Sequence, residues 1–375
     1  MIRVVHIVGA MDLGGAETLI MNLYRNFNRE EVQFDFLCHN RIEAKYTDEI
    51  KSLGGRLYMV EGISHVGLFN YQKNLYKFFK NHPEYQIVHS HQNDLSGIIL
   101  KQAAKAGVKV RITHSHTEYH HKSLKKKAIF EIFKHYVNKH TTDAFACAKP
   151  AGEMLYTGKR LENFKVIHNG IDTEKFAFSS ENRKRLREEL NLGENPVICH
   201  VGRFAKVKNH GFIIDVFNEF LKVYSNAKLM LIGEGELLSE MKEKVKTLGI
   251  EDGVLFLGPR TDVNALMSVA DIFLFPSIHE GLPVSVVEAQ CSGLRILTSD
   301  TISKDTVITD LIERMSLSDS AQCWAYKLCN LCENPSANRN HYSKKVAANG
   351  FSAKEIADSL VKYYIKSLSG DIKCD

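Results

Sequence analysis

The sequence predicts an α/β protein made of two consecutive, doubly wound, Rossmann-like domains. The chain has 375 residues, and at roughly 150 residues per domain this length favours two domains. Short β-branched segments alternate with segments of helical periodicity in both halves, a pattern typical of parallel sheets with crossover helices. Hydrophobic residues make up 44% and charged residues 25% of the chain. This composition can fill two buried cores and argues against disorder.

The first half carries seven short apolar segments that we predict to be strands. They cover residues 2–8, 32–38, 56–60, 86–90, 109–113, 143–147 and 164–168. Helical patterns between them cover residues 16–28, 69–80, 95–106 and 124–140. The first segment has no basic leader and no small-residue cleavage site, so we interpret it as a strand and not as a signal peptide. No apolar run reaches the ~18 residues of a transmembrane helix. We expect the eight cysteines to be reduced thiols in a cytoplasmic protein.

A second series of apolar segments predicts the second domain. These strands are expected at residues 197–201, 228–232, 254–257, 271–275 and 295–298. The polar stretch 169–195 is interpreted as a linker with a lead-in helix. We therefore assign residues 1–172 to the first domain and 173–351 to the second. The tail 352–368 has the apolar spacing of an amphipathic helix, which by pattern alone fits against either domain. Paired domains of this kind usually bind ligands in the cleft where they face each other.

Positive charge is concentrated in the N-terminal half. Residues 1–172 hold 24 Lys+Arg against 17 Asp+Glu, or +7, and the remainder holds 25 against 27, or −2, which together give +5. A basic half favours an anionic partner such as phosphate, nucleic acid or a membrane surface. An unevenly charged, solvated surface would give the same numbers.

A glycine-rich loop follows the first predicted strand and opens the first helix. Gly14 and Gly15 would let the backbone approach a phosphate at a helix N-terminus. The loop is not a P-loop, because Ala16 and Glu17 replace the required Lys and Ser/Thr. It also lacks the G-x-G-x-x-G spacing of a dinucleotide site. A tight strand–helix turn explains the pattern equally well.

Two cations follow the first predicted strand of the second domain. Arg203 and Lys208 are thereby placed at the carboxyl edge of that sheet, where α/β folds bind ligands. A guanidinium fork with an ammonium suits a diphosphate. Two solvated cations in a loop are the alternative.

The most informative segment follows the apolar strand at 271–275. It reads Pro-Ser-Ile-His-Glu-Gly-Leu-Pro from residue 276 and continues into a helical pattern with Glu288 in its second turn. Pro283 suits the first turn of that helix. Glu280 and Glu288 bracket the helix start, where they can bind a hydroxyl-rich ligand beside an anion. A capping role for Glu280 fits the composition equally.

This Glu280-x7-Glu288 arrangement within S-x-x-E-G-L-P resembles the signature of retaining GT-B glycosyltransferases of glycosyltransferase family 4. Further segments agree in order along about residues 1–300. They are the Gly-Gly-Ala-Glu run at 14–17, Ile-His-Asn-Gly-Ile-Asp at 167–172, Gly202-Arg203 with Lys208-Asn209, Gly-Glu-Gly at 233–235 and Ala270-Asp271. After Asp300 the resemblance thins, and residues 304–349 show only helical patterns around Trp324.

The resemblance implies the GT-B fold and a role for each of these residues. Arg203 and Lys208 would stabilise the departing diphosphate, with the backbone of Gly14 and Gly15 close to it. Glu280, with Gly281, Leu282 and Pro283, would bind the donor sugar, and Glu288 the ribose hydroxyls. Arg260 would lie near the base. The tail, residues 352–375, would cross back to complete the first domain. No cofactor and no metal are expected, and no D-x-D motif is present.

The family also carries a histidine of the first domain near the reacting sugar. Here His114 and His116 are two candidates, and we favour His116. His89 and His91 form a parallel H-x-H pair on the preceding strand end. Such pairs place both rings on one face and are compatible with zinc. We favour a polar lining, because no Cys or carboxylate set completes a tetrahedral site in the sequence pattern.

The segment around residues 122–137 combines lysines with an apolar stripe. We expect the stripe to pack mostly on the core, and Lys122, Lys125, Lys126 and Lys127 to face anionic lipid head groups or a pyrophosphate-linked acceptor. No recognised nucleic-acid-binding module is present, so nucleic acid is not expected as a partner.

The predicted function is retaining transfer of a hexose-type sugar from a nucleoside-diphosphate sugar, with a UDP-sugar favoured. The expected acceptor is a lipid-linked saccharide of capsular or exopolysaccharide biosynthesis, on the cytoplasmic face of the cell membrane. The alternatives are a GT-B sugar-nucleotide epimerase, a transferase acting on a small soluble acceptor, and a non-catalytic sugar-nucleotide-binding partner subunit.

Overall fold

The computed structural model describes residues 1–12, 14–116, 123–336 and 338–369. The chain forms two compact units. Unit 1 comprises Met1–Gly170 together with the C-terminal segment from Ala353, and unit 2 comprises Ile171–Ser352. The first boundary therefore lies two residues before the one expected from the sequence, and the tail belongs to unit 1.

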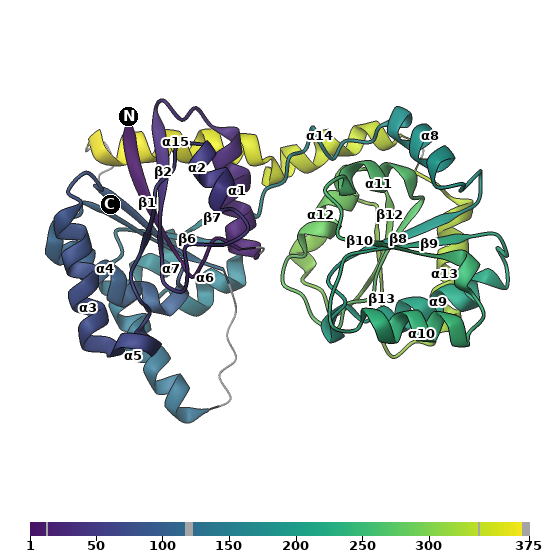
Figure 1. Cartoon of the computed structure of the whole chain (residues 1–375), viewed down its shortest axis with the longest axis horizontal. Coiled ribbons are helices and arrows are strands. Elements are labelled where there is room, and N and C mark those ends of the chain that lie inside the picture. The colour runs from purple at the N-terminus through teal and green to yellow at the C-terminus, as the bar shows by residue number, and fades with distance from the viewer. Residues whose placement is uncertain (13, 117–122, 337, 370–375) are drawn as a thin grey trace. The chain divides into compact units, whose positions relative to one another are not determined.

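Unit 1 is built on a seven-stranded parallel sheet in the order β3-β2-β1-β4-β5-β6-β7 (Figure 1). Its strands are β1 (Ile2–Val8), β2 (Val32–Cys38), β3 (Leu57–Met59), β4 (Ile87–Ser90), β5 (Val110–Ser115), β6 (Asp143–Ala146) and β7 (Lys165–Val166). The strand order reverses between β1 and β4. At such a switch point the loops leaving the carboxyl ends diverge and leave room for a ligand.

Helices cover both faces of this sheet. They are α1 (Gly15–Asn26), α2 (Thr47–Ser52), α3 (Ile63–Asn81), α4 (Ser96–Ala106), α5 (Leu124–His140), α6 (Lys149–Leu155), α7 (Lys159–Asn163) and α15 (Ala353–Ser369). One core joins α1 and α15 to the sheet through Tyr24 and Tyr364, and the opposite core joins α3 and α4 through Leu75 and Ile99. The amphipathic tail predicted from its apolar spacing is thus part of the first core.

Unit 2 repeats the plan with a six-stranded parallel sheet in the order β10-β9-β8-β11-β12-β13. Its strands are β8 (Val197–Val201), β9 (Lys228–Ile232), β10 (Val254–Gly258), β11 (Ile272–Phe275), β12 (Arg295–Ser299) and β13 (Ile312–Met315). Its helices are α8 (Ser180–Glu189), α9 (His210–Leu221), α10 (Leu238–Thr247), α11 (Val263–Val269), α12 (Val284–Cys291), α13 (Ala321–Glu333) and α14 (Tyr342–Val346). Here the strand order reverses between β8 and β11.

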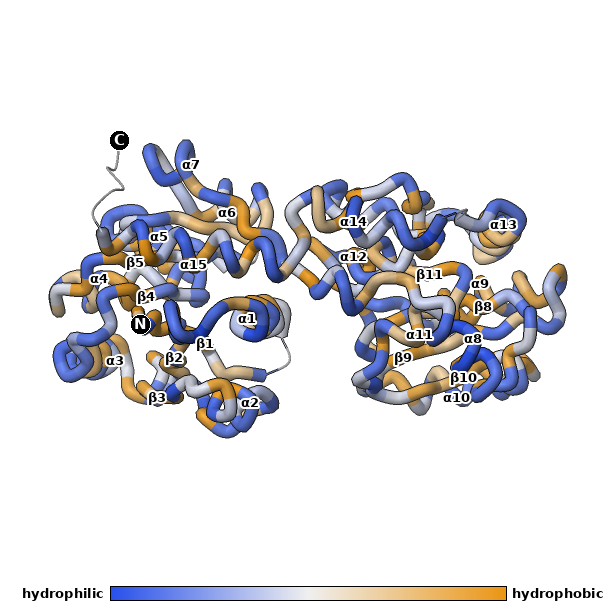
Figure 2. The backbone as a smooth tube through the Cα atoms, turned by 90° about the horizontal axis from the view of Figure 1, so that it is seen from above, coloured by the Kyte–Doolittle hydropathy of each residue, from blue (hydrophilic) through white to orange (hydrophobic). Residues whose placement is uncertain are grey.

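The apolar strands form because parallel strands covered on both faces must bury almost every side chain. All seven residues of β2 and all four of β11 are buried, and the strands are largely apolar in Figure 2 whereas α8 is hydrophilic along most of its length. The prediction of only helical patterns beyond residue 304 is wrong at β13. Its four residues are only half-buried and include Glu313 and Arg314, as an edge strand permits, so they lack a strand-like apolar pattern. In the described part of the chain, no helix is both long and apolar enough to cross a membrane.

Candidate functional site

The switch point of unit 2 brings together the loops that follow β8 and β11. The Ile278 amide donates to the Val207 carbonyl at 2.8 Å, and the Asn209 side chain donates to the Pro276 carbonyl at 3.2 Å. Asn209 adopts a left-handed conformation with φ 59°, tolerable for Asn, and α9 starts directly after it. These bonds fix the loop after β8 against the loop after β11, which are the two predicted donor-binding loops.

Lys208 and Glu280 meet at this point. Lys208 Nζ lies 2.8 Å from Glu280 Oε1, and the two side chains are 18% and 22% exposed. The ammonium also lies 4.7 Å from the centre of the Phe275 ring. The backbone of Glu280 is fixed by a bridge to Ile302, whereas α12 has Pro283 as its N-cap residue and no side-chain capping bond. The capping interpretation of Glu280 is therefore wrong, and its carboxylate is held beside a cation at the sheet edge.

The Arg203 loop rests on two glycines whose purpose the sequence pattern did not reveal. Gly233 has φ 142° and a Cβ there would lie 2.2 Å from the Gly202 carbonyl oxygen. Gly235 has φ 154° and a Cβ there would lie 2.6 Å from the Phe204 carbonyl oxygen. The Phe204 amide donates to the Glu234 carbonyl at 2.8 Å. This close backbone packing positions Arg203, whose side chain is exposed, next to the Lys208 loop.

Glu288 lies in the second turn of α12, as the sequence predicts. Burial raises the pKa of its carboxyl to about 7, and the more distant Lys175 opposes that shift. Gly281 is exposed and Leu282 is half-buried, so the backbone between Glu280 and α12 is open to a ligand. A Cβ on Gly281 would have no neighbour within 4 Å.

Arg260 is already paired within its own loop. Its Nε and Nη2 donate to the two carboxylate oxygens of Asp262 at 2.8 and 2.6 Å, and this pair is exposed at the end of β10. Among the predicted donor-site residues, Arg260 therefore has a guanidinium whose charge is already neutralised by the Asp262 carboxylate.

In unit 1, the predicted glycine loop forms the start of α1. Gly14 is the N-cap residue of that helix, and a Cβ on Gly15 would have no neighbour within 4 Å. A Cβ on Gly14 would lie 2.2 Å from Glu17 Oε2, so the Glu17 carboxylate folds back onto the helix start. Burial raises the pKa of Glu17. The acidic side chain thus stands where an anion would approach.

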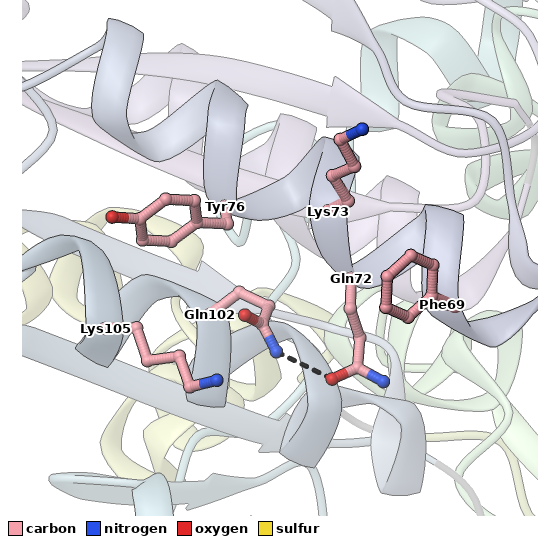
Figure 3. A pocket seen from close by; sticks show the side chains of 6 residues that line it. All are labelled: Phe69, Gln72, Lys73, Tyr76, Gln102 and Lys105. Carbon is pink, nitrogen blue, oxygen red and sulfur yellow. Dashed lines mark hydrogen bonds between the residues drawn. The ribbon is translucent and has the colours of Figure 1, made fainter.

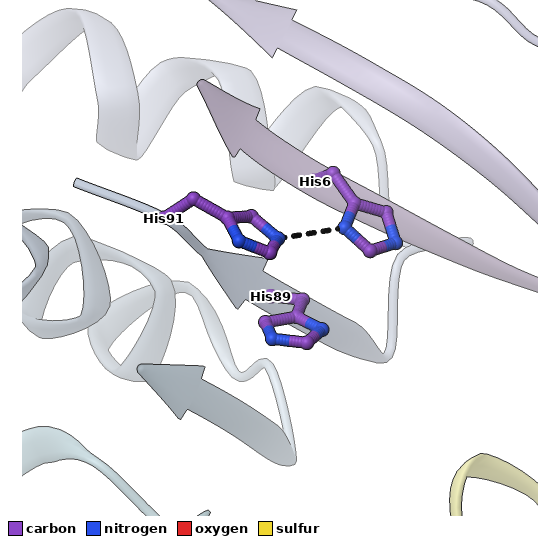
Figure 4. A group of neighbouring side chains, drawn as sticks. All are labelled: His6, His89 and His91. Carbon is purple, nitrogen blue, oxygen red and sulfur yellow. Dashed lines mark hydrogen bonds between the residues drawn. The ribbon is translucent and has the colours of Figure 1, made fainter. Parts of the chain in front are cut away.

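Five histidines line the carboxyl ends of β1, β4 and β5 at the switch point of unit 1. The alternation of strand residues puts His6, His89, His91, His114 and His116 on one face. His91 Nε2 lies 3.0 Å from His6 Nδ1 (Figure 4), and His91 Nδ1 lies 2.8 Å from His116 Nε2. Sequence reasoning missed His6, which sits inside the first strand as an isolated histidine among apolar residues.

Burial lowers the pKa of every ring in this cluster. The pKa falls to about 3 for His6 and to about 4 for His116, and well below the usual value for His89, His91 and His114. All five imidazoles are therefore neutral at pH 7, with one lone pair each. His114, of which 1% is exposed, has neither ring nitrogen hydrogen-bonded within the described residues.

The apolar stripe of α5 divides along the helix. Its C-terminal part packs on the core as expected: Val137 is buried and Phe133 and Tyr136 pack against the cluster under α4, where a Cβ on Gly97 would lie 2.5 Å from the Val137 backbone nitrogen. Nearer the N-terminus, Ile129 is 43% and Ile132 56% exposed, and Leu124 at the helix start is 85% exposed. Exposed Lys125, Lys126 and Lys127 flank these side chains, whereas Lys122 lies outside the described residues.

A surface pocket of about 500 Å³ lies between α3 and α4 in the same unit. Figure 3 shows its lining of Phe69, Gln72, Lys73, Tyr76, Gln102 and Lys105, with Gln102 donating to Gln72 at 2.9 Å. Phe69 is 81% exposed. Unit 1 therefore displays exposed apolar side chains next to lysines on both α3 and α5.

Two protein families match the chain. The family described as "Glycosyltransferase Family 4" matches residues 13–175, and the family described as "Glycosyl transferases group 1" matches residues 182–348. Together they span most of both units.

Relatives and solved structures agree with these matches. The chain is 33% identical to "Putative glycosyltransferase EpsF" of Bacillus subtilis over 98% of both chains. It is 28% identical to the Staphylococcus aureus "Capsular polysaccharide biosynthesis glycosyltransferase CapH" over 80% of this chain and 82% of CapH. It is 24% identical to the Escherichia coli "UDP-Gal:alpha-D-GlcNAc-diphosphoundecaprenol alpha-1,3-galactosyltransferase" over 80% and 79%. The crystal structure of Anabaena HepE with UDP matches with a TM-score of 0.79 at 16% identity, over 98% of this chain and 100% of HepE.

Proposed function

The chain belongs to the glycosyltransferases of family 4, which have the GT-B fold, and on that premise we propose that it transfers a hexose from a UDP-sugar with retention of the anomeric configuration. Unit 2 binds the donor. The observation that carries this proposal is the Lys208–Glu280 pair at the switch point of unit 2.

The chemistry of that pair fits a sugar nucleotide. Cleavage of the bond between sugar and phosphate leaves negative charge on the departing diphosphate, which preorganised cations stabilise. Lys208 and the exposed Arg203 supply that charge, and the Glu280 carboxylate accepts hydrogen bonds from sugar hydroxyls. Glu288 and the open backbone at Gly281 and Leu282, which precede the buried Pro283, extend the same edge toward the ribose and the sugar. Arg260 contributes to binding the base only if it leaves Asp262.

The choice of UDP rests on relatives. HepE is crystallised with UDP, and the E. coli relative is named for a UDP-galactose donor and a diphosphoundecaprenol-linked acceptor. By the same analogy, the acceptor is a lipid-linked saccharide of capsular or exopolysaccharide biosynthesis. Unit 1 carries acceptor-binding residues and His116, which contacts the substrate. In the glycine loop, the Gly14 amide already donates to the Asp12 carbonyl at 3.0 Å, so the backbone at Gly15, where a Cβ would have no neighbour within 4 Å, is the part that a phosphate can approach.

The membrane association of this enzyme is peripheral and on the cytoplasmic face. Exposed Leu124 and Ile132 beside Lys125, Lys126 and Lys127 give α5 the character of a helix that lies on an anionic bilayer. The transfer step itself needs no metal or cofactor, since Lys208 and Arg203 provide the positive charge at the diphosphate.

The decisive experiment is a transfer assay with the purified chain, a panel of UDP-sugars and GDP-sugars, and lipid-linked or short saccharide acceptors. The expected result is transfer from one UDP-sugar, with an α-linked product from an α-linked donor as read by NMR. Incubation without acceptor distinguishes a transferase from an epimerase, because an epimerase would convert the sugar nucleotide to its epimer with no acceptor present. Tight UDP binding without transfer from any sugar nucleotide of the panel would instead identify a non-catalytic sugar-nucleotide-binding subunit.

A further inference from the structure

We propose that His91, His114 and His116 form a binding site for a divalent transition cation of the zinc class, and that occupancy of this site inhibits sugar transfer. The three side chains offer ligand nitrogens that all lie within 4.8 Å of one another. The inhibitory part of the proposal rests on the role proposed for His116, whereas the binding part does not.

The sheet itself assembles this site. Ser90 of β4 lies beside Thr113 of β5, so the next residues, His91 and His114, are neighbours across the two strands. His116 follows His114 by two positions and shares its face. The ring centres lie 5.3 Å apart for His91 and His114, and 4.2 Å apart for His114 and His116.

The distances suit a metal ion once the rings rotate, because a metal–nitrogen bond lies in the plane of the imidazole, whereas the His114 and His116 rings are stacked with an angle of 24° between them. Zinc–nitrogen bonds of about 2.0–2.1 Å in a tetrahedral site put ligand nitrogens roughly 3.3 Å apart. His91 Nδ1 and His116 Nε2, now 2.8 Å apart, must separate slightly, and the third nitrogen must approach by no more than about 1.5 Å. His116 is partly exposed, which provides an entry route and a place for a water as fourth ligand.

The unpartnered nitrogens of His114 point to a ligand. A buried imidazole N–H or lone pair without a hydrogen bond costs free energy, and His114 leaves both of its nitrogens in that state within the described residues. A metal bond to one of the two nitrogens gives that nitrogen a partner and leaves only the other without one. The rings are neutral, so binding at pH 7 requires tautomers to change but no net loss of protons.

His6 has the position of a supporting residue. Histidines that bind metals usually donate their second ring nitrogen to a partner, which fixes the ring. His91 Nε2 is held 3.0 Å from His6 Nδ1 on the neighbouring strand, as Figure 4 shows. His6 would accept the His91 N–H once Nδ1 of His91 is taken by the ion.

Inhibition of sugar transfer is expected because the ion occupies the lone pair of His116 Nε2. A cation bound to His116 Nε2 removes that nitrogen from hydrogen bonding and adds positive charge next to the substrate. On this proposal, a transition cation bound at these histidines stops the sugar transfer proposed above.

Binding is tested on the full-length chain after chelator treatment, without any sugar or nucleotide. Co²⁺ titration followed by visible absorption, and Zn²⁺ titration followed by calorimetry, should show one ion per chain. His114→Phe should weaken binding by at least about a hundredfold, and His6→Phe by about 10- to 100-fold. His39→Phe is the matched control, because His39 is buried in the same unit outside the cluster, and it should leave the affinity unchanged.

Three results would overturn the site: no saturable binding to a chain that unfolds cooperatively, equal binding by wild type and His114→Phe, or loss of binding with His89→Phe but not with His114→Phe. Inhibition is read separately, as the ratio of transfer rates with and without Zn²⁺. This ratio should fall at least tenfold for the wild type and recover with chelator, and the Zn²⁺ concentration that halves the transfer rate should rise by about 10- to 100-fold for His6→Phe. If the chain shows no transfer activity, the binding data still show whether the metal site exists. A failure of the metal-site proposal can therefore be told apart from a failure of the proposed function.

Discussion

Lys208 Nζ lies 2.8 Å from Glu280 Oε1, although the two residues are separated by more than seventy positions in the chain. The contact exists because β8 and β11 are adjacent at the switch point of the unit 2 sheet. Without a ligand, each group neutralises the other. A sugar diphosphate offers both of them better partners, phosphate oxygens for the ammonium and hydroxyls for the carboxylate, so donor binding should separate the pair.

Lys208→Ala should weaken UDP binding strongly. A charge-assisted hydrogen bond contributes about 1.5–3 kcal/mol, which corresponds to a loss of roughly 10- to 150-fold in affinity. Titration calorimetry with UDP measures it. Lys206→Ala is the matched control, because Lys206 is an exposed lysine two positions away, and it should change the affinity less than threefold.

Glu280→Gln should separate binding from transfer. UDP carries no sugar, so the loss of the carboxylate should leave UDP affinity unchanged or raise it, because Lys208 is released. Transfer from the UDP-sugar should fall by at least about a hundredfold, a loss of about 2.7 kcal/mol. A parallel loss of UDP affinity would contradict the assignment of Glu280 to the sugar.

Glu288→Gln should stabilise unit 2 by an amount that grows as the pH rises from 4.5 to 7 and is full above pH 7. The native pKa of Glu288 is raised to about 7, above its ordinary value of 4.5, so the folded chain holds a proton that the unfolded chain has released. Stability therefore falls as pH rises from 4.5 to 7. Glutamine mimics the protonated carboxyl. Thermal unfolding should show a gain of roughly 2–4 °C at pH 8 and none at pH 4.5.

The same carboxyl should make UDP binding pH-dependent. Ribose hydroxyls donate to the ionised form, so affinity should drop about tenfold between pH 8 and pH 6 as Glu288 takes up its proton. Glu288→Gln should bind more weakly at pH 8 and lose the part of the pH dependence that exceeds the titration of UDP itself. Calorimetry of both chains at the two pH values measures the difference, and identical pH profiles would exclude Glu288 from the ribose site.

Gly233→Ala should destabilise unit 2 and displace the Arg203 loop. Its Cβ would lie 2.2 Å from the Gly202 carbonyl oxygen at φ 142°, so the backbone must shift at a cost of about 1–3 kcal/mol. Thermal unfolding should register this loss and UDP affinity should fall with it. Gly281→Ala is the control for stability, because a Cβ there meets nothing within 4 Å; a melting temperature equal to that of Gly233→Ala would refute the packing argument.

Replacing Lys125, Lys126 and Lys127 by Gln should release the chain from anionic membranes. Each lysine near such a surface contributes about 1 kcal/mol, so the triple change should weaken binding by roughly a hundredfold. Sedimentation with vesicles of phosphatidylglycerol and phosphatidylcholine measures it. Exposed Lys222, Lys242 and Lys246 of unit 2 replaced together provide the control of equal charge, and an equal loss in both variants would show that only net charge matters.

Local pattern was sufficient for most of the fold. A parallel strand covered on both faces reads as a continuous apolar run, so segments such as Ile272–Phe275 and Lys228–Ile232 could be predicted within a residue or two. One edge strand was missed, because Ile312–Met315 carries charged side chains on a half-open edge. Within the stripe of α5, the exposure of Ile129 and Ile132 could not be predicted, because an apolar stripe has the same spacing whether a core or solvent lies beside it.

The sequence by itself determined the residue types and their order: the two sheets, the loops at their carboxyl ends, and the motifs that resemble family-4 glycosyltransferases. Only the tertiary structure decided which of those residues meet. Strand order places Lys208 against Glu280 and adds His6 to the two H-x-H pairs. The physical reason is that periodicity records which face a side chain takes, while neighbours across a sheet depend on strand order and register, which are set by packing between segments far apart in the chain.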